Sequence, residues 1–226
     1  MNKPKLVVYG VGSMASTYVM YLEDEFDVVA YTATSEYLSS DSFNGKPLYP
    51  FEEIDTILPP QDYQMSIAVG YVQLNKIRQS IAEQAKQKGY ALATHISSDV
   101  KRHRSIEVGQ NTVIFDKTSI HPNCKIGDNV FISSNVQLGH DCIVGHNVWI
   151  NAGVCIGGGT KIEDNTFIGM NSTISHGITV GKKSIVGAAT LVTKSVPDES
   201  VIIAPAGEVQ PIKSEVFLRL SGLGND

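Results

Sequence analysis

The sequence contains few of the residues that mark several large protein classes. Only 3 cysteines occur in 226 residues, so the disulfide framework of small secreted domains is not expected. Basic residues number 18 against 23 acidic ones, and the net charge of −5 argues against a nucleic-acid partner. No apolar run approaches the roughly 20 residues of a membrane span, and the first residues show no signal-peptide pattern. We therefore expect a cytoplasmic globular protein.

The most regular feature of the chain is an aliphatic residue at every sixth position from Val108 to Val192. The positions are Val108, Ile114, Ile120, Ile126, Ile132, Leu138, Val144, Ile150, Ile156, Ile162, Ile168, Ile174, Val180, Val186 and Val192. Ile, Leu and Val make up 57 of the 226 residues, so this series would arise by chance about once in 10⁹ trials. The six-residue period is therefore structural.

Each hexapeptide is predicted to form one short strand and one corner. The aliphatic residue and the small or β-branched residue two positions earlier, such as Cys124 or Cys142, share one side of a strand and should point inward. Glycine often follows the aliphatic residue, where we expect it to supply the backbone angles of a tight corner. Three corners would close a triangular coil of eighteen residues. About five coils would stack into a parallel β-helix with ladders roughly 4.8 Å apart.

Residues 1–95 lack this period and are predicted to form a small α/β domain. The expected elements are strands at 6–9, 28–31 and 65–69 and helices at 14–22 and 73–88. Gly89 suits the end of the second helix. The expected fold is an α/β Rossmann-like domain, 1–95, followed by a parallel β-helix of hexapeptide repeats with a C-terminal cap, 96–226.

The turn after the first strand contains Gly10 and Gly12 and could hold a phosphate, because backbone N–H groups and the helix dipole converge there. The third glycine of the dinucleotide pattern is Ala15, which that pattern allows, but no Asp or Glu follows the second strand. A nicotinamide cofactor is therefore disfavoured, and a tight turn without a ligand is the alternative. Arg78 is expected on the polar side of its helix, as a solvated charge or a phosphate contact.

The chemically distinctive residue is His140, which Asp141 and Cys142 follow. It lies two positions after an inward aliphatic residue and is therefore expected on an outward corner. An imidazole titrates near neutrality and suits removal of a proton from an attacking amine or hydroxyl, typically for ~10²- to 10⁴-fold in rate. The alternative is an exposed corner histidine without a chemical role.

The hexapeptide period and the His140-Asp141-Cys142 element resemble the acyl-CoA-dependent sugar acyltransferases built on a left-handed β-helix. The chain is most similar to the branch with a nucleotide-binding domain in front, the sialic acid O-acetyltransferases and UDP-amino-sugar N-acetyltransferases of bacterial glycan synthesis. The resemblance covers nearly the whole chain. It implies a left-handed β-helix, His140 as the general base and Asp141 as the carboxylate that raises the basicity of His140.

The resemblance also implies two binding sites. The expected contacts to acetyl-CoA are Trp149, Gly158, Met170 and Ala188, with the Gly158 N–H on the thioester oxygen. The expected contacts to the nucleotide-linked sugar are Gly12, Ser13, Met14, Tyr31, Thr32 and Gly70. Relatives often carry a CoA-contacting His near the place of Trp149. As the only Trp, and on an outward position, it is expected to pack against CoA, substrate or a neighbouring subunit.

A homotrimer is expected because relatives have threefold symmetry and because apolar residues point outward from the flat faces. Those residues are Val113, Phe115, Phe131, Trp149 and Phe167. In such a trimer, His140 of one chain would face Met170 and Ala188 of the next.

The interpretation is an acetyl-CoA-dependent transferase of acetyl groups to the amino group of a nucleotide-linked sugar, with O-acetylation of a sugar or sialic acid as the alternative. Two remote alternatives are a zinc-dependent carbonic anhydrase of the γ type and a non-catalytic scaffold. Within one chain, His140 and His176 would be two coils, roughly 10 Å, apart and His146 one face away, so no metal is expected.

Overall fold

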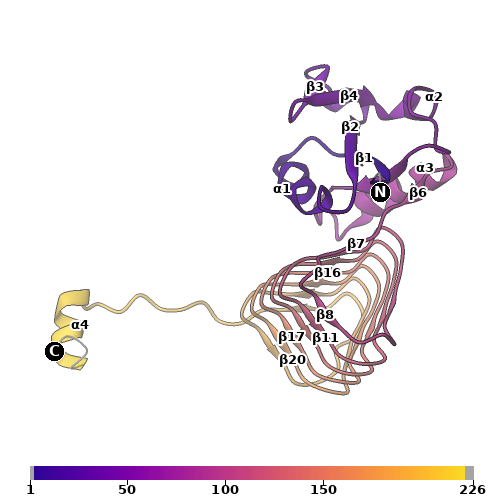
Figure 1. Ribbon diagram of the computed structural model, residues 1–226. Coiled ribbons are helices and arrows are strands. Elements are labelled where there is room, and N and C mark those ends of the chain that lie inside the picture. The colour runs from indigo at the N-terminus through magenta and orange to yellow at the C-terminus, as the bar shows by residue number, and fades with distance from the viewer. Residues whose placement is uncertain (1–2, 222–226) are drawn as a thin grey trace.

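The computed structural model describes residues 3–221 and contains an α/β domain followed by a triangular β-helix (Figure 1). The N-terminal domain has a six-stranded sheet in the order β3-β4-β2-β1-β5-β6, parallel except for the β3–β4 pair. Its strands are β1 (Lys5–Tyr9), β2 (Asp27–Ala33), β3 (Ser42–Phe43), β4 (Lys46–Pro50), β5 (Gln64–Ile67) and β6 (Ala91–Leu92). Its helices are α1 (Ser13–Leu22), α2 (Ile54–Ile57) and α3 (Lys76–Gln87), with 3-10 turns η1 (Ser35–Tyr37) and η2 (Phe51–Glu53).

Helices cover both faces of this sheet. Leu6 and Val8 of β1 pack in one cluster with α1, whereas Val7 and Tyr9 pack in another with α2 and α3. Alternate side chains of a strand point to opposite faces, so a sheet covered on both sides needs a continuous apolar run such as residues 6–9. The arrangement is an open, mostly parallel sheet with β2 and β1 at its centre.

The β-helix consists of three parallel sheets, one for each face of the prism. The domain-facing sheet is β7 (His95–Ile96), β10 (Val113–Ile114), β13 (Phe131–Ile132), β16 (Trp149–Ile150), β19 (Phe167–Ile168), β22 (Ile185–Val186) and β24 (Val201–Ile202). The second face is β8 (Lys101–Arg102), β11 (Ser119–Ile120), β14 (Gln137–Leu138), β17 (Cys155–Ile156), β20 (Thr173–Ile174) and β23 (Leu191–Val192). The third face is β9 (Glu107–Val108), β12 (Lys125–Ile126), β15 (Ile143–Val144), β18 (Lys161–Ile162) and β21 (Thr179–Val180).

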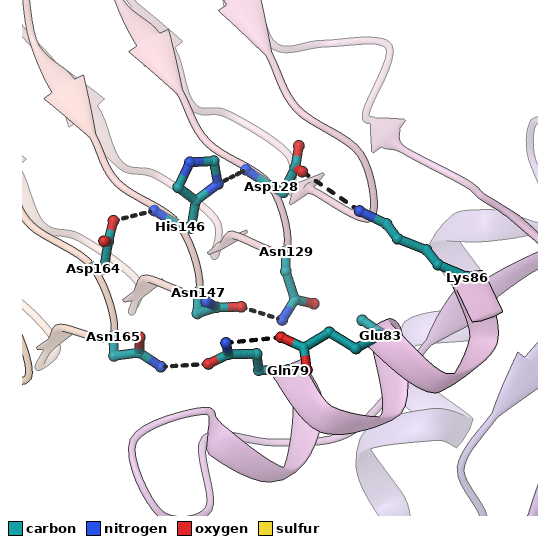
Figure 2. A pocket seen from close by; sticks show the side chains of 10 residues that line it. Gln79, Glu83, Lys86, Asp128, Asn129, His146, Asn147, Asp164 and Asn165 are labelled. Atoms are coloured by element: carbon teal, nitrogen blue, oxygen red, sulfur yellow. Dashed lines mark hydrogen bonds and ion pairs between the residues drawn. The ribbon is translucent and has the colours of Figure 1, made fainter.

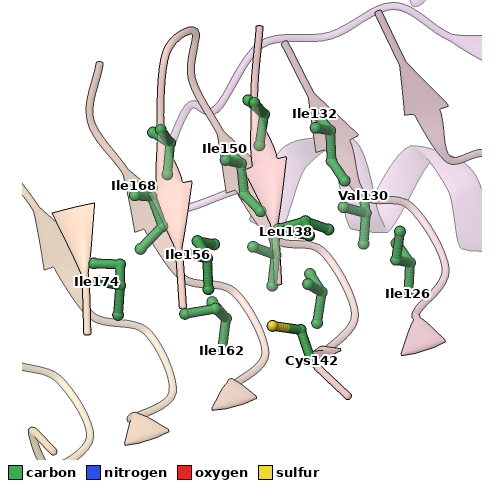
Figure 3. Close-up of a cluster of buried hydrophobic side chains, with 14 of the residues drawn as sticks. Ile126, Val130, Ile132, Leu138, Cys142, Ile150, Ile156, Ile162, Ile168 and Ile174 are labelled. Carbon is green, nitrogen blue, oxygen red and sulfur yellow. The ribbon is translucent and has the colours of Figure 1, made fainter. Parts of the chain in front are cut away.

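Successive coils pair in register at an offset of eighteen residues, as in Phe131 with Trp149. The predicted inward positions are confirmed, because the aliphatic residues from Ile114 to Val192 are at most 4% exposed. They form a continuous column inside the prism (Figure 3). The small residues two positions earlier are buried beside them, and Thr112 illustrates how their hydroxyls are satisfied: its Oγ1 donates to the Gly127 carbonyl at 2.8 Å.

The prediction that glycine supplies the corner angles was wrong. The left-handed residue is the third after the aliphatic one, with φ between 52° and 72° at fourteen consecutive positions: Asn111, Lys117, Asn123, Asn129, Asn135, Asp141, Asn147, Gly153, Gly159, Asn165, Asn171, Gly177, Lys183 and Ala189. Half are Asn, which adopts positive φ more readily than most residues. The glycines directly after the aliphatic residues instead allow the backbones of successive coils to pack closely. A Cβ on Gly127 would lie 2.7 Å from the Gly145 carbonyl oxygen of the next coil.

The N-terminal domain covers the outward side of the domain-facing sheet. Val113, Phe115, Phe131 and Trp149 are buried in one cluster with α1 and β1. Trp149 is only 3% exposed, and its ring stacks on Phe131 at 3.9 Å between centroids. The predictions that these apolar residues form a subunit interface and that Trp149 contacts CoA were therefore wrong. Their partner is the chain's own first domain.

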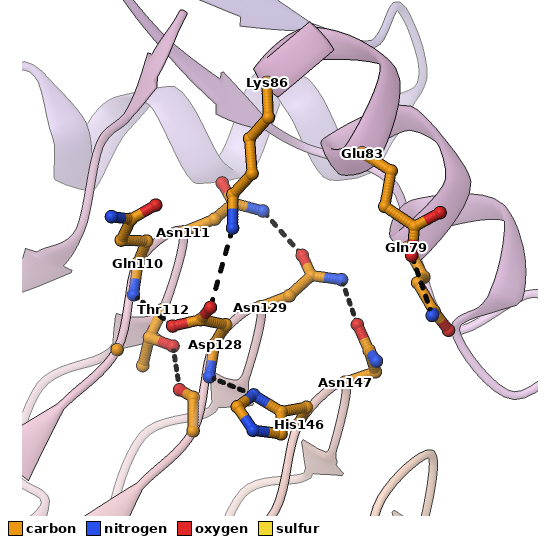
Figure 4. Close-up of polar contacts among 12 residues, drawn as sticks. Gln79, Glu83, Lys86, Gln110, Asn111, Thr112, Asp128, Asn129, His146 and Asn147 are labelled. Carbon is orange, nitrogen blue, oxygen red and sulfur yellow. Dashed lines mark hydrogen bonds and ion pairs between the residues drawn. The ribbon is translucent and has the colours of Figure 1, made fainter.

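A ladder of asparagines joins this domain to one corner of the prism (Figure 4). Asn111 Nδ2 donates to Asn129 Oδ1 at 2.6 Å, and Asn129 Nδ2 donates to Asn147 Oδ1 at 2.7 Å. Arg78 is fully buried beside the ladder and donates to the carbonyls of Ile67 and Asn111. The expectation of a solvated or phosphate-binding Arg78 was therefore wrong, because its charge lies in the seam between the domains. We call this edge, between the third face and the domain-facing sheet, the asparagine corner.

After β24 an extended segment leads to α4 (Ser214–Ser221), which stands apart from the prism (Figure 1). Most apolar side chains of α4 are exposed, as for Phe217 at 51% and Leu220 at 74%. None of the helices within residues 3–221 has the length and apolar character needed to cross a membrane.

Candidate active site

His140 lies on the corner between the second and third faces, here called the His140 corner. Its Nδ1 is 2.6 Å from Asp141 Oδ2, and the two side chains are 67% and 55% exposed. Because the Asp141 carboxylate accepts at Nδ1, the proton of the neutral ring sits there and Nε2 is left as the free acceptor. The corner therefore presents a basic imidazole nitrogen to a neighbouring molecule.

Asn123, one coil earlier, completes the orientation of this pair. Its Nδ2 donates to Asp141 Oδ1 at 3.0 Å, while the Asp141 N–H donates to the Pro122 carbonyl at 2.9 Å. Hydrogen bonding with His140, and secondly with Asn123, holds the pKa of Asp141 below its ordinary value of 3.8. A carboxylate of this kind adds stability above the ordinary pKa and loses it as the pH falls through the lower folded value. The Asp141 side chain is thus ionised throughout the neutral range. Asn123 was missed from sequence, although its offset of eighteen residues from Asp141 is a usable signal.

Gly158, one coil after His140, lies directly beneath the imidazole. A Cβ on Gly158 would be 2.7 Å from His140 Nε2, so only glycine leaves the ring in place. No residue between 3 and 221 accepts a hydrogen bond from the Gly158 N–H, whereas the N–H of Gly159 donates to the His140 carbonyl at 2.7 Å. The placement of His140 over Gly158 thus brings an acceptor nitrogen close to this backbone donor.

Met170 and Ala188 lie on a different edge, the Met170 corner between the domain-facing sheet and the second face. They are stacked in successive coils, since the Ala189 N–H donates to the Met170 carbonyl at 2.8 Å. Both are exposed, Met170 at 55%. A single chain therefore does not bring these two residues to His140.

The N-terminal domain contains a crevice of about 400 Å³ at the carboxyl ends of β1 and β5. It is lined by Gly12 from the loop after β1, by Ser13 and Met14 at the start of α1, and by Gly70 from the loop after β5. The chain leaves β1 towards one edge of the sheet and β5 towards the other, and ligands of open parallel sheets bind at such a switch point. No residue between 3 and 221 accepts from the N–H of Ser13 or Met14, at the start of α1. Those donors suit an anion.

Two of the predicted substrate contacts do not reach this crevice. Tyr31 and Thr32 are both 0% exposed within β2. The Tyr31 hydroxyl accepts from Asn44 Nδ2 at 3.2 Å, and Thr32 Oγ1 donates to the Tyr49 carbonyl at 2.9 Å. The prediction of a binding role for them was wrong, because the strand continues to Ala33 and buries both side chains inside the domain.

A second cavity, of about 360 Å³, lies between α3 and the asparagine corner (Figure 2). Its polar lining is engaged in local contacts: Lys86 Nζ is 3.5 Å from Asp128 Oδ2, and His146 Nδ1 accepts from the Asp128 N–H at 3.0 Å. The Asp164 carboxylate accepts from the His146 N–H at 2.8 Å. Within residues 3–221, no group of three or more His, Cys, Asp or Glu side chains is placed to hold a metal ion.

The fold and site define a hexapeptide-repeat β-helix protein with a His–Asp pair on one corner and an α/β domain in front. A family model described as the GMPPB C-terminal domain matches residues 108–219, just under half of the chain. No curated protein sequence matches the chain.

Several solved structures share the fold over both domains. The acetyltransferase domain of PglB from Neisseria gonorrhoeae FA1090 has 24% identity and a TM-score of 0.79, covering 92% of this chain and 100% of its own. PerB from Caulobacter crescentus, in complex with CoA and GDP-perosamine, has 23% identity and a TM-score of 0.80, covering 88% and 94%. WeeI from Acinetobacter baumannii AYE has 24% identity and a TM-score of 0.71, covering 88% and 96%.

Proposed function

We propose that this protein is an acetyl-CoA-dependent acetyltransferase that acetylates the amino group of a nucleotide-linked amino sugar in bacterial surface glycan synthesis. The observation that carries the proposal is His140, with Nδ1 held by Asp141 at 2.6 Å and Nε2 free above Gly158. A left-handed β-helix that follows a Rossmann-like domain in the chain would present this base beside an activated sugar. The structures of PerB with CoA and GDP-perosamine and of the PglB domain with acetyl coenzyme A support the choice of substrates.

The proposed roles of the residues follow from their donors and acceptors. Acetyl-CoA, when bound, would supply the acetyl group as an activated thioester. His140 Nε2 accepts the proton that the acceptor amine loses as its nitrogen attacks, while the Asp141 carboxylate stabilises the resulting imidazolium. The Gly158 N–H donates to the thioester oxygen as negative charge develops there. As the C–S bond breaks, the CoA sulfur leaves as a thiolate and takes the proton from the His140 imidazolium, which restores the neutral base.

The geometry of the prism supports a reaction site shared between two copies of the chain. The His140 corner is the edge opposite the domain-facing sheet, so the crevice and His140 of one chain lie on different sides of the prism. Met170 and Ala188, proposed to line the CoA path, occupy a third edge. In a cyclic trimer, His140 of one chain would meet the Met170 corner of the next, and three equivalent sites would close the ring.

The test is release of CoA thiol from acetyl-CoA with a panel of UDP-, GDP- and dTDP-linked amino sugars. The matched controls are the same nucleotides carrying a hydroxyl in place of the amine. If thiol is released with an amino sugar and not with its hydroxyl counterpart, the result supports N-acetylation. If thiol is released with the hydroxyl sugar and not with the amino sugar, the reaction is O-acetylation. Absence of release with every acceptor, from protein shown to be folded, contradicts the proposal.

Replacing Asp141 with asparagine is expected to lower kcat by at least about tenfold with little loss of thermal stability. An Asn amide can turn its Nδ2–H towards His140 Nδ1, which favours the tautomer with a proton on Nε2 and removes the acceptor. Stability should be kept because Asn suits the left-handed backbone of this position, where φ is 58°. Steady-state kinetics and a melting curve measure both effects. An unchanged kcat would show that Asp141 does not orient the imidazole.

A further inference from the structure

The turn between β5 and α3 has a backbone conformation that is rare outside glycine. Gln73, Leu74 and Asn75 are all left-handed, with φ of 51°, 52° and 64°. L-residues adopt this region singly, and Asn more readily than Gln or Leu, so three in succession persist only where surrounding contacts hold them. The helix predicted from residue 73 therefore begins at Lys76.

The β-helix supplies those contacts on one side of the turn. Asn165 Nδ2 donates to the Leu74 carbonyl at 3.1 Å and to Gln79 Oε1 at 3.3 Å, the second contact being visible in Figure 2. Asn75 Nδ2 donates to the Asn147 carbonyl at 2.7 Å, and Asn75 is 1% exposed. Asn147 and Asn165 lie on successive coils at the asparagine corner. The strained turn is thus hydrogen-bonded to two adjacent coils of the β-helix.

The other side of the same turn borders the crevice at the ends of β1 and β5. Val72 and Ile77 line that crevice together with Gly70. The Tyr71 ring, next to Val72 in the chain, lies 5.4 Å from the Trp149 ring and 4.7 Å from the Phe167 ring, measured between centroids. Residues 71–75 therefore connect the wall of the crevice with the aromatic cluster on the β-helix.

We propose that Asn165 is a positioning residue for the nucleotide-linked substrate, acting through the turn 71–75. Its amide holds the turn in the left-handed form that places Val72 at the crevice, and occupancy of the crevice is transmitted through Tyr71 to Trp149. The proposal rests on the proposed function, since it assigns the crevice to the nucleotide. It adds that a β-helix side chain outside the crevice sets the affinity for that ligand.

Trp149 is the only tryptophan, so its emission reports directly on this contact. The experiment titrates the full-length protein with UDP, GDP and dTDP while recording Trp149 fluorescence, with calorimetry as an independent measure of binding. It compares wild type with Asn165→Gly, which keeps the left-handed backbone and removes the amide. The matched control is Asn135→Gly, because Asn135 has φ of 59°, is exposed, and lies on the Met170 corner away from the turn.

We expect a saturable change in emission with one nucleotide, a Kd at least fivefold higher in Asn165→Gly and an unchanged Kd in Asn135→Gly. With the sugar substrate, Asn165→Gly should raise KM and leave kcat within about twofold, because the base and the donor at Gly158 are not touched. Equal Kd values, or binding detected by calorimetry without any change in emission, would overturn the proposal and leave the proposed function standing. Absence of calorimetric binding of all three nucleotides to wild type would overturn the assignment of the crevice, and both proposals with it.

Discussion

Replacing His140 with alanine is expected to reduce kcat by about 10²- to 10⁴-fold, the range typical of a lost general base. The side chain is 67% exposed, and within residues 3–221 its ring is hydrogen-bonded to Asp141 alone. The backbone carbonyl of His140 separately accepts from the Gly159 N–H. Removing the imidazole creates no cavity and leaves the backbone bond in place. The melting temperature and the affinity for nucleotide should therefore be unchanged. Initial rates of thiol release at saturating substrates measure the effect.

A control separates this prediction from a general loss of activity. His176→Ala removes another exposed imidazole from the same corner, two coils along, and should leave kcat within about twofold. If His140→Ala keeps the wild-type kcat, His140 is not the base.

Replacing Gly127 with alanine is expected to destabilise the fold by about 3 kcal/mol or more, at the upper end of overpacking effects. The added Cβ would lie 2.7 Å from the oxygen and 2.8 Å from the carbon of the Gly145 carbonyl. Those atoms belong to the next coil, where the ladder bond from the Gly127 N–H to the Val144 carbonyl is 2.8 Å long. Neither backbone segment can move without breaking the hydrogen bonds that join it to the coils on either side. For a chain of this size we expect a fall in melting temperature of roughly 6–12 °C.

The matched control for Gly127 is Gly177→Ala. Gly177 has φ of 67° and no atom within 4 Å of an added Cβ, so its substitution costs only the left-handed backbone, roughly 1–2 kcal/mol. Denaturant unfolding of both variants measures the difference. A larger loss at Gly177 than at Gly127 would show that backbone angles, and not the distance between coils, require the glycines of the repeat.

The period of six was sufficient to predict the β-helix, because it is a local rule repeated at every strand. Ile132 or Ile150 must point inward whichever coil lies next to it, since alternation within a strand decides the side. The pairing of His140 with Gly158 followed from the same counting. The same offset of eighteen residues relates Asn123 to Asp141, although asparagine recurs at so many corners that its identity alone does not mark a functional residue.

Other assignments failed where a side chain's environment depends on the second domain. Trp149 does occupy an outward position of its strand, but the N-terminal domain covers it to 3% exposure. Arg78 lies on a helix face that looks polar, yet that face meets the asparagine corner and the guanidinium is fully buried. Tyr31 and Thr32 lie within the sheet because β2 extends to Ala33, beyond the strand predicted at 28–31.

The sequence by itself determined the architecture, the corner that carries His140 and the crevice loop at Gly12 and Ser13, because each depends on residues close in the chain or at a constant offset. Only the tertiary structure decided which face of the prism is covered, which aromatic residues are buried and which strained turn joins the crevice to the β-helix. Those features arise from contacts between segments that no period relates. The contact from Asn165 to Leu74 joins residues 91 positions apart, and nothing in the local pattern of either residue specifies the other.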